Sequence, residues 1–523
     1  VGKVMTMPPL REVERSGKLP LSFAQQRLWF IDQLEPESAA YNIPAAVRLR
    51  GKLNVEALQR SFAEVVRRHE VLRTTFVTEA GEPQQVIGTD YEVELTVLDF
   101  SHLPEAERGT TAREWATSEA AQPFVLSEGP LLRVGLARLS EEEQVLAVTM
   151  HHIISDGWSV GVLTREVSEL YEAYSRGEES PLAELAVQYA DFAVWQREWL
   201  QGEVLEQQLA YWREQLADLV PLELPTDRVR PAVPSHVGEV LSFDLSADLT
   251  TELQALSRRN GVTLFMTLLA GFAALLARYS GQDQITVGTP VANRAQPKTE
   301  DLIGFFVNQL VLRTDLSGDP TFNELLKQVR KTTLGAYEHQ DVPFERLVEV
   351  LMPERDLSRT PLFQVMLVLQ NARREDLRLA GLEVESLADE TRPAKFDLAL
   401  ELQETSGGIH GTFEYSTDLF KATTVKRLAA HFQNLLERVI AQPDRRLSQL
   451  SLLTNIEREQ LLVTWSHNGR RYEQEKCIDD LFAEQATRAP DQIAAAGPDG
   501  FLTYGILHEQ SSRLAQLIKE LQR

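Results

Sequence analysis

The chain has 523 residues, 43% of them hydrophobic and 25% charged, which is typical of a folded protein. Its formal net charge of −24 at pH 7 argues against general binding of nucleic acid, because such binding requires basic surfaces. The single cysteine, Cys477, excludes an internal disulfide, and the sequence has no zinc-type cluster and no glycine-rich phosphate loop. Together these features favour a cytoplasmic monomer that binds neither nucleic acid nor membrane.

The first part of the chain alternates predicted helices and strands. Residues 1–18 are polar and have the character of a leader or linker. Helical spacing follows at residues 21–34 and again after Asn54, a residue type that favours the N-cap position. The apolar run EQVLAVTM predicts a buried strand that ends at His151. Because helical spacing begins again after Gly157, the segment HHIISDG is predicted to connect a strand to a helix.

The second part repeats this order after a proline-rich segment at residues 220–235. The stretches EVLSFDL and QITVGTPVANR predict strands, and residues 250–259 predict a helix. Residues 262–279 are almost uncharged, but they are few for a membrane span, so we interpret them as a buried core helix. A last amphipathic helix is expected at residues 422–441. Two similar α/β (α+β) halves predict a pseudo-dimer with a ligand-binding cleft between them.

Seven stretches along the chain, taken in order, resemble the condensation domains of nonribosomal peptide synthetases. They are LSFAQQRLWF, RHEVLRTTF, MHHIISDGWS, YADFAVWQ, IGFFVNQLVLR, HQDVPFERLVE and SRTPLFQVMLVLQN. The HHxxxDG pattern in the third is shared with other acyltransferases of the chloramphenicol acetyltransferase type, whereas the seven together are far more specific. Near the end, LFAEQATRAPDQIA and LTY resemble the first residues of an adenylation domain.

The resemblance implies two chloramphenicol-acetyltransferase-like lobes that form a V-shaped pseudo-dimer around a tunnel. They would span residues 19–200 and 201–455, followed by a linker at 456–472 and the truncated start of an adenylation domain at 473–523. Donor and acceptor thioesters would enter the tunnel from opposite faces, each on the phosphopantetheine arm of a peptidyl carrier protein. The chain itself would bind no cofactor and no metal, and its partners would be the two carriers and the rest of the synthetase.

In this reaction an amine attacks a thioester, so it needs a neutral nucleophile, close positioning and a place for oxyanion charge. The resemblance makes His152 the candidate that accepts the amine proton, or that orients the amine and stabilises the charged intermediate. Gly157 would let the backbone approach the substrate, and its N–H at a helix start is the candidate oxyanion donor.

The other motif residues are expected to be structural or orienting. His151 lies on the strand and would point away from His152. The resemblance favours an ion pair between Asp156 and an arginine in RHEVLRTTF, either Arg68 or Arg73, of which we choose Arg68.

Five residues are expected to line the tunnel: Arg27, Trp29, Trp158, Ser159 and Asn308. For Asn308 the alternative is a core asparagine bonded to backbone. The next residue is Gln309, where the family often has threonine, and this departure leaves the amine-side wall of the tunnel open to question.

Other functions remain as alternatives. An epimerization domain shares HHxxxDG, and a stand-alone acyltransferase would use coenzyme A. A heterocyclization domain would have aspartate in place of the first histidine, so His151 argues against it. The non-enzyme alternative is a platform on which carriers dock. Within condensation domains, the motifs resemble the type with an L-configured donor or the starter type with a fatty acyl donor.

Overall fold

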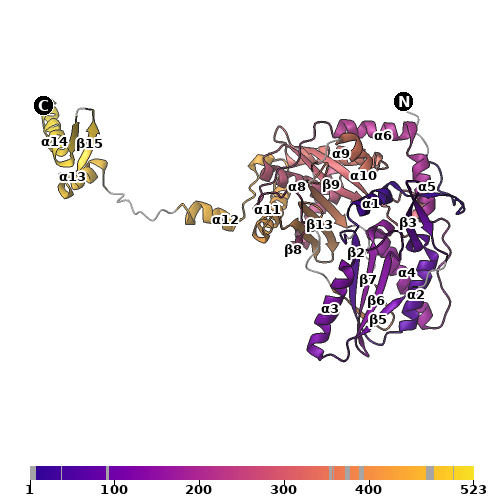
Figure 1. Ribbon diagram of the computed structural model, residues 1–523. Helices are drawn as coiled ribbons and strands as arrows, with labels where there is room; N and C mark the ends of the chain where they lie inside the picture. The colour runs from indigo at the N-terminus through magenta and orange to yellow at the C-terminus, as the bar shows by residue number, and fades with distance from the viewer. Residues whose placement is uncertain are drawn as a thin grey trace. The chain divides into compact units, whose positions relative to one another are not determined.

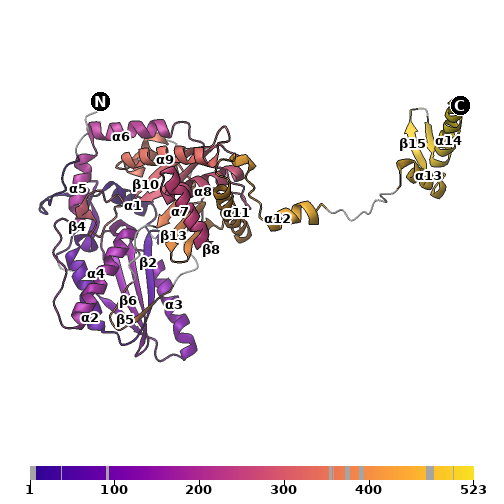
Figure 2. The same cartoon turned by 180° about the vertical axis from the view of Figure 1, so that it is seen from behind.

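The computed structural model describes residues 7–36, 38–89, 93–352, 356, 358–370, 377–387, 394–466, 476–498 and 500–522. The chain forms two compact units, Val1–Thr454 and Asn455–Arg523. Figures 1 and 2 show the elements of both units from opposite sides.

The first lobe of the large unit is built on a five-stranded sheet with the order β12-β2-β7-β6-β5. All of its pairs are antiparallel except β5 with β6. A three-stranded sheet, β1-β4-β3, lies in the same part of the chain. The strands are β1 (Leu19–Pro20), β2 (Asn42–Arg50), β3 (Thr74–Glu79), β4 (Glu82–Ile87), β5 (Leu95–Asp99), β6 (Leu132–Ser140), β7 (Glu143–His151) and β12 (Glu383–Ser386). The helices are α1 (Phe23–Leu34), α2 (Val55–Arg68), α3 (Glu105–Ala121), α4 (Gly157–Ser175) and α5 (Tyr189–Trp199), with short 3-10 turns η1 (Glu70–Arg73) and η2 (His152–Ile154).

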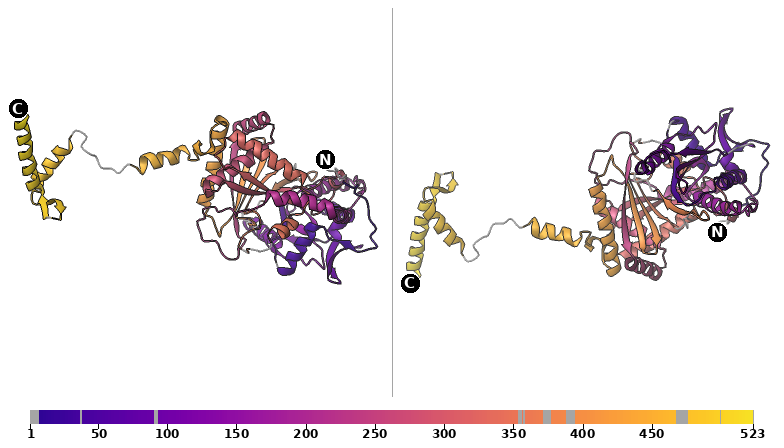
Figure 3. Two further views of the ribbon diagram at one scale, coloured as in Figure 1. Left: turned by 90° about the horizontal axis from the view of Figure 1, so that it is seen from above. Right: turned by 90° about the horizontal axis from the view of Figure 1, so that it is seen from below.

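The second lobe is built on a six-stranded mixed sheet with the order β10-β9-β11-β13-β14-β8. Its strands are β8 (Gly238–Ser246), β9 (Gln284–Val291), β10 (Asn308–Asp315), β11 (Val365–Gln370), β13 (Leu398–Thr405) and β14 (Gly408–Ser416). Its helices are α6 (Gly202–Gln215), α7 (Ala247–Asn260), α8 (Leu264–Ser280), α9 (Phe322–Glu338), α10 (Phe344–Leu351) and α11 (Ala422–Ala441), with turns η3 (Pro297–Thr299) and η4 (Leu447–Gln449). Helices α7, α8, α9 and α11 pack against one another and against strands of this sheet. Figure 3 shows the same lobe from above and from below.

Several sequence predictions are confirmed by these elements. The side chain of Asn54 caps α2 by accepting a hydrogen bond from the Ala57 N–H at 3.0 Å. The apolar helix predicted at residues 262–279 is α8, and twelve of its residues are buried in the core of the second lobe. Among the described residues no single helix is long and apolar enough to cross a membrane, although α7 and α8 pass that test as a pair bent by 103°.

Two segments from beyond residue 200 belong to the core or sheet of the first lobe. Strand β12 pairs with β2, so that Val384 lies opposite Leu49. Residues 302–306 contribute Leu302, Ile303 and two phenylalanines to the first hydrophobic core. The two tandem halves are therefore not independent in space, and the second of these segments reaches the HHxxxDG motif.

The small unit contains α12 (Asn455–Glu459), a π-helical turn η5 (Gln460–Thr464), α13 (Ile478–Arg488), β15 (Ile493–Gly497), β16 (Gly500–Thr503) and α14 (Tyr504–Leu521). Strands β15 and β16 form a two-stranded antiparallel sheet. In the described part of this unit, Ala486 is the one fully buried hydrophobic residue. Where the sequence predicted a helix–strand–helix order, the small unit has two strands between α13 and α14, and it has very little core of its own.

Candidate active site

The HHxxxDG motif lies at the junction between β7 and α4, as the sequence predicted. Strand β7 ends at His151, the turn η2 begins at His152, and α4 begins at Gly157. The backbone N–H of His152 donates to the carbonyl of Tyr41 at 2.8 Å, and that of His151 donates to Leu131 at 2.9 Å. The two histidines are thereby fixed to different neighbouring segments of the first lobe.

The side chain of His152 is oriented by the turn that follows it. Its Nδ1 lies 2.8 Å from the carbonyl oxygen of Ser155. Because a carbonyl can only accept, Nδ1 must carry the proton, and in the neutral ring Nε2 is left with a free lone pair. The ring meets Phe305 edge to face at 4.7 Å between centroids. Within the described residues, no protein group is hydrogen-bonded to Nε2.

Burial, together with the positive charge of Lys395, lowers the pKa of His152 to about 4, and the opposing effect of Asp156 is smaller. The imidazole is therefore neutral near pH 7, in the state that can accept a proton. The side chain is only partly buried, so that a substrate could reach it.

His151 has a different environment. It is 4% exposed, its ring lies edge to face with Phe124 at 6.1 Å, and its Nδ1 accepts from the Ile153 N–H at 3.2 Å. Burial, with smaller effects of the charges on His152 and Lys395, lowers its pKa to about 3. These contacts are those of a structural residue that holds the turn closed.

The carboxylate of Asp156 joins the start of α4 to a segment of the second half. It is 2% exposed and accepts five hydrogen bonds. One oxygen accepts from the N–H and hydroxyl of Ser159 at 2.8 and 2.7 Å, and from Arg294 at 3.3 Å. The other accepts from the backbone N–H groups of Phe306 and Val307 at 2.9 and 3.2 Å. None of these bonds goes to His152, so the geometry gives Asp156 a structural place and not one in a catalytic triad.

The predicted ion pair between Asp156 and Arg68 is wrong, because the cation beside Asp156 is Arg294. Arg68 instead pairs with Glu166 on α4 at 3.1 Å. His69 also bonds Glu166, at 2.9 Å. The other candidate, Arg73, lies beside Glu70 at 3.9 Å.

Residues 303–307 are held by both of these buried networks. His69 accepts from the Ile303 N–H at 3.3 Å, and the Ser159 hydroxyl accepts from the Gly304 N–H at 3.0 Å. The hydroxyl of Tyr189 donates to the Phe305 carbonyl at 2.6 Å. The segment that carries Phe305, the aromatic neighbour of His152, is therefore fixed by charged and polar groups of the first lobe.

Gly157 borders open space. A Cβ atom placed on it would meet no atom within 4 Å, and its backbone is not in the left-handed region. It is the first residue of α4, where backbone N–H groups have no partner within the helix. An N–H at such a position is available to a developing negative charge.

The residues that follow Gly157 differ from each other. Trp158 is 37% exposed, and its indole N–H donates to the Glu300 carbonyl at 2.8 Å. Ser159 was expected to line the tunnel, but it is fully buried, and its hydroxyl bonds Asp156, Gly304 and Arg294. Its place is inside the network, so that expectation is wrong.

The other expected tunnel residues occupy three kinds of position. The amide of Asn308 donates to the carbonyls of residues 340 and 342 at 2.7 and 2.8 Å, and its oxygen accepts from the Phe344 N–H. Asn308 is thus a core asparagine bonded to backbone, as the alternative interpretation had it. It fixes the start of α10 and does not face a tunnel. Arg27 pairs with Glu345 on α10 at 3.0 Å and is partly exposed. Trp29 is partly buried against the first core.

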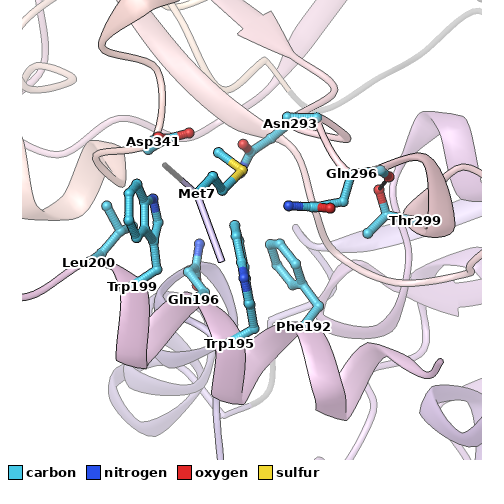
Figure 4. Close-up of a pocket in the computed structure, with 11 residues that line it drawn as sticks. Met7, Phe192, Trp195, Gln196, Trp199, Leu200, Asn293, Gln296, Thr299 and Asp341 are labelled. Carbon is cyan, nitrogen blue, oxygen red and sulfur yellow. Dashed lines mark hydrogen bonds between the residues drawn. The ribbon is translucent and has the colours of Figure 1, made fainter. Parts of the chain in front are cut away.

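A pocket lined by other residues lies beside α5 (Figure 4). Phe192, Trp195 and Trp199 line it from α5, and Met7, Asn293 and Gln296 lie across from them. None of the expected site residues lines this pocket. The N-terminal segment passes here, because the Trp195 indole donates to the Pro8 carbonyl at 2.8 Å.

The fold, the strand-to-helix junction and the paired histidines together are those of a condensation domain. The Condensation domain family model matches residues 15–462, and the chain belongs to this family. Condensation domains form amide bonds in nonribosomal peptide synthetases, so the chain is a member of an acyltransferase class of enzymes.

The relatives are parts of such synthetases. The chain is 49% identical over 519 residues to one of the proteins that make up the linear gramicidin synthase of Brevibacillus parabrevis, covering 99% of this chain and 7% of that protein. It is 42% identical to phosphinothricin tripeptide synthetase PhsC of Streptomyces viridochromogenes, covering 97% of this chain and 47% of that protein. The chain therefore spans less than half of the length of each of these relatives.

Among solved structures, the X-domain in its complex with OxyB from teicoplanin biosynthesis is similar, with a TM-score of 0.78 and 33% identity. The match covers 86% of this chain and 99% of that one. The two-lobe, chloramphenicol-acetyltransferase-like fold implied by the sequence is thus confirmed.

Proposed function

We propose that the chain joins a donor acyl or peptidyl thioester to the amine of an acceptor aminoacyl thioester, with both substrates carried on phosphopantetheine arms. The observation that carries the proposal is the state of His152, a neutral ring whose Nε2 has no partner among the described residues. It stands five residues before Gly157, the first residue of α4, which borders open space. A proton acceptor and an N–H donor thus belong to one short turn.

The chemistry follows from these two groups. The neutral amine attacks the thioester carbonyl, a C–N bond forms, and negative charge develops on the carbonyl oxygen. In the tetrahedral adduct the nitrogen carries a positive charge and is more acidic than a free ammonium group, and Nε2 of His152 accepts its proton. The N–H of Gly157 stabilises the oxyanion. The C–S bond then breaks, and the thiolate of the donor arm leaves with the proton.

Positioning supplies much of the rate, because the thioester is already activated. Well-oriented reacting pairs reach effective molarities of about 10⁵ M or more. The tunnel between the lobes is the proposed place where two arms meet. The proposed partners are the donor and acceptor carrier proteins and an adenylation domain that the small unit begins, in a monomer of the cytoplasm.

The test is single-turnover amide formation with both carriers preloaded. His152→Ala should fold normally, because it strands no buried charge, and amide formation should fall about 10²-fold or more. A melting curve and carrier binding are measured beside it. A folded His152→Ala protein with a near-wild-type rate would refute the role of His152 and leave catalysis to positioning.

A coenzyme A thioester of the same acyl group is the matched control for the carrier. It should be consumed far more slowly than the carrier-bound donor. Equal rates would instead favour a stand-alone acyltransferase. A protein that binds carriers but forms no amide would favour a docking platform, a function consistent with the complex named for the X-domain.

A further inference from the structure

Lys395 is a charged residue that the sequence analysis did not single out, and the structure holds it firmly. The Ala394 N–H donates to the His236 carbonyl at 2.9 Å, and the Asp397 N–H donates to Gln364 at 3.0 Å. The Asp397 carboxylate also binds both terminal nitrogens of Arg230. Ala394 and Asp397 are buried, whereas Lys395 between them is exposed, so its side chain leaves the core of the second lobe.

That side chain reaches the first lobe at Tyr41, the residue before β2, which is hydrogen-bonded to the backbone of His152. The Nζ of Lys395 lies 4.8 Å from the centroid of the Tyr41 ring, a cation–π contact. The carbonyl of the same Tyr41 accepts the backbone N–H of His152 at 2.8 Å. One residue therefore links the ammonium group to the backbone of His152, and the charge of Lys395 acts on both motif histidines.

The other charges around this place come from several elements. Lys395 lowers the pKa of His152, whereas Asp156 raises it. Glu414 of β14 raises the pKa of Lys395, and Arg27 of α1 lowers it. Arg27 is itself paired with Glu345 of α10.

Part of the Lys395 side chain meets solvent, yet protein surrounds it. Burial, with a smaller effect of Arg27, lowers its pKa to about 8 against the opposing charge of Glu414. About nine-tenths of the molecules therefore carry the ammonium charge at pH 7.

We propose that Lys395 is a positioning residue of the active site, whose ammonium group, held against the Tyr41 ring, adds to burial in disfavouring the imidazolium form of His152. The inference rests on the proposed function of His152 and adds a residue from the other lobe to it. The physical reason is that a second positive charge near the ring makes the imidazolium less favourable. Because the ammonium comes from the second lobe, the state of His152 depends on how the two lobes meet.

The first measurement follows the His152 ring itself and needs no substrate. The protein is labelled at histidine Cε1, the signal of His152 is assigned with His152→Gln, and its shift is followed during acid titration. With the wild-type pKa at about 4, the ring should stay neutral over most of the range. In Lys395→Met the His152 ring should begin to take up a proton at a pH that is higher by about 0.5 unit or more. Lys395→Arg, which keeps the charge, should behave as the wild type does.

The controls separate this effect from general changes. Lys331→Met removes an exposed lysine of α9 and should leave the His152 titration unchanged. Lys395→Gln is a second neutral variant in case Lys395→Met fails to fold, which a melting curve shows. If neither neutral variant moves the titration of His152, the inference is overturned.

The second measurement is the pH dependence of single-turnover amide formation. If the proposed role of His152 is right, the acid limb of the profile should move to higher pH in Lys395→Met and return in Lys395→Arg. A shifted His152 titration with an unchanged pH profile would overturn the proposed role of His152, because the ring would then titrate without affecting the chemistry. The two failures are therefore distinguishable.

Discussion

Replacing Asp156 with asparagine separates a structural role from a catalytic one. The variant keeps the shape of the side chain but changes one acceptor oxygen into an NH₂ donor. Both oxygens of Asp156 face donors: Ser159 and Arg294 on one side, and the N–H groups of Phe306 and Val307 on the other. Either orientation of the amide therefore leaves at least two buried donors without an acceptor.

The magnitude follows from these contacts. Each buried donor left unpaired costs about 1–3 kcal/mol, and removing one partner of a buried ion pair costs about 3–5 kcal/mol. We expect Asp156→Asn to destabilise the local structure by about 3–5 kcal/mol, which is roughly a 10²-fold or larger change in local opening. Amide formation should fall as well, since the same network fixes the turn of His152 and the segment of Phe305.

Hydrogen exchange measured by mass spectrometry detects this local destabilisation in the peptides concerned. Peptides from residues 155–162 and 302–310 should exchange faster in Asp156→Asn, and the unfolding midpoint in urea should fall. The matched control is Asp244→Asn, whose carboxylate is 80% exposed and pairs with His410 on the surface. Loss of turnover in Asp156→Asn with wild-type exchange and unfolding would refute the reasoning and move Asp156 into the chemistry.

Three further outcomes are expected. Gly157→Ala should fold as the wild type does, because the new Cβ meets no atom within 4 Å, but it should slow amide formation because the Cβ enters the space meant for substrate. Gly161→Ala, whose Cβ is equally free of contacts on the same helix, is the control. Equal single-turnover rates for the two variants would contradict a close approach of substrate to the backbone of Gly157. His151→Ala should lower the melting temperature, since it removes a buried ring and the acceptor of the Ile153 N–H, and an unchanged melting curve would count against a structural His151. The free energy of unfolding should decrease as pH falls below about 6.5. The reason is that the pKa values of His151 and His152 are lowered to about 3 and about 4 in the folded protein, so the unfolded chain takes up protons first. Urea titrations at several pH values measure this dependence, and His151→Gln should make it less steep.

Periodicity and capping predicted local structure well, because both depend on neighbours along the chain. The cap at Asn54, the end of β7 at His151 and the buried helix α8 follow from such signals. The pairing of β12 with β2 could not be predicted in this way, because the sequence pattern of a short polar strand does not indicate which strand it pairs with. The placement of residues 302–306 in the first core is of the same kind: their apolar character predicts burial but not the lobe in which they are buried.

The error at Arg68 has a physical origin that the sequence did contain. Helix α4 carries two buried acids, Asp156 and Glu166, and each needs its own cation. Glu166 lies on the apolar face that Leu163, Val167 and Leu170 define, so its burial could have been inferred from helical spacing. A buried acid at that position takes up Arg68 and His69 and leaves Asp156 to another partner.

That partner, Arg294, lies just beyond the end of β9, and no local spacing distinguishes it from other arginines. Its guanidinium also bonds the carbonyl of Leu302 and lies 4.0 Å from the centroid of the Phe306 ring. Asp156 and Arg294 therefore both hold one segment, residues 302–307. Since this segment also carries the aromatic neighbour of His152, the ion pair shapes the surroundings of the proposed proton acceptor without touching it. An acid of the motif can thus support activity by joining the start of α4 to a segment of the second half of the chain.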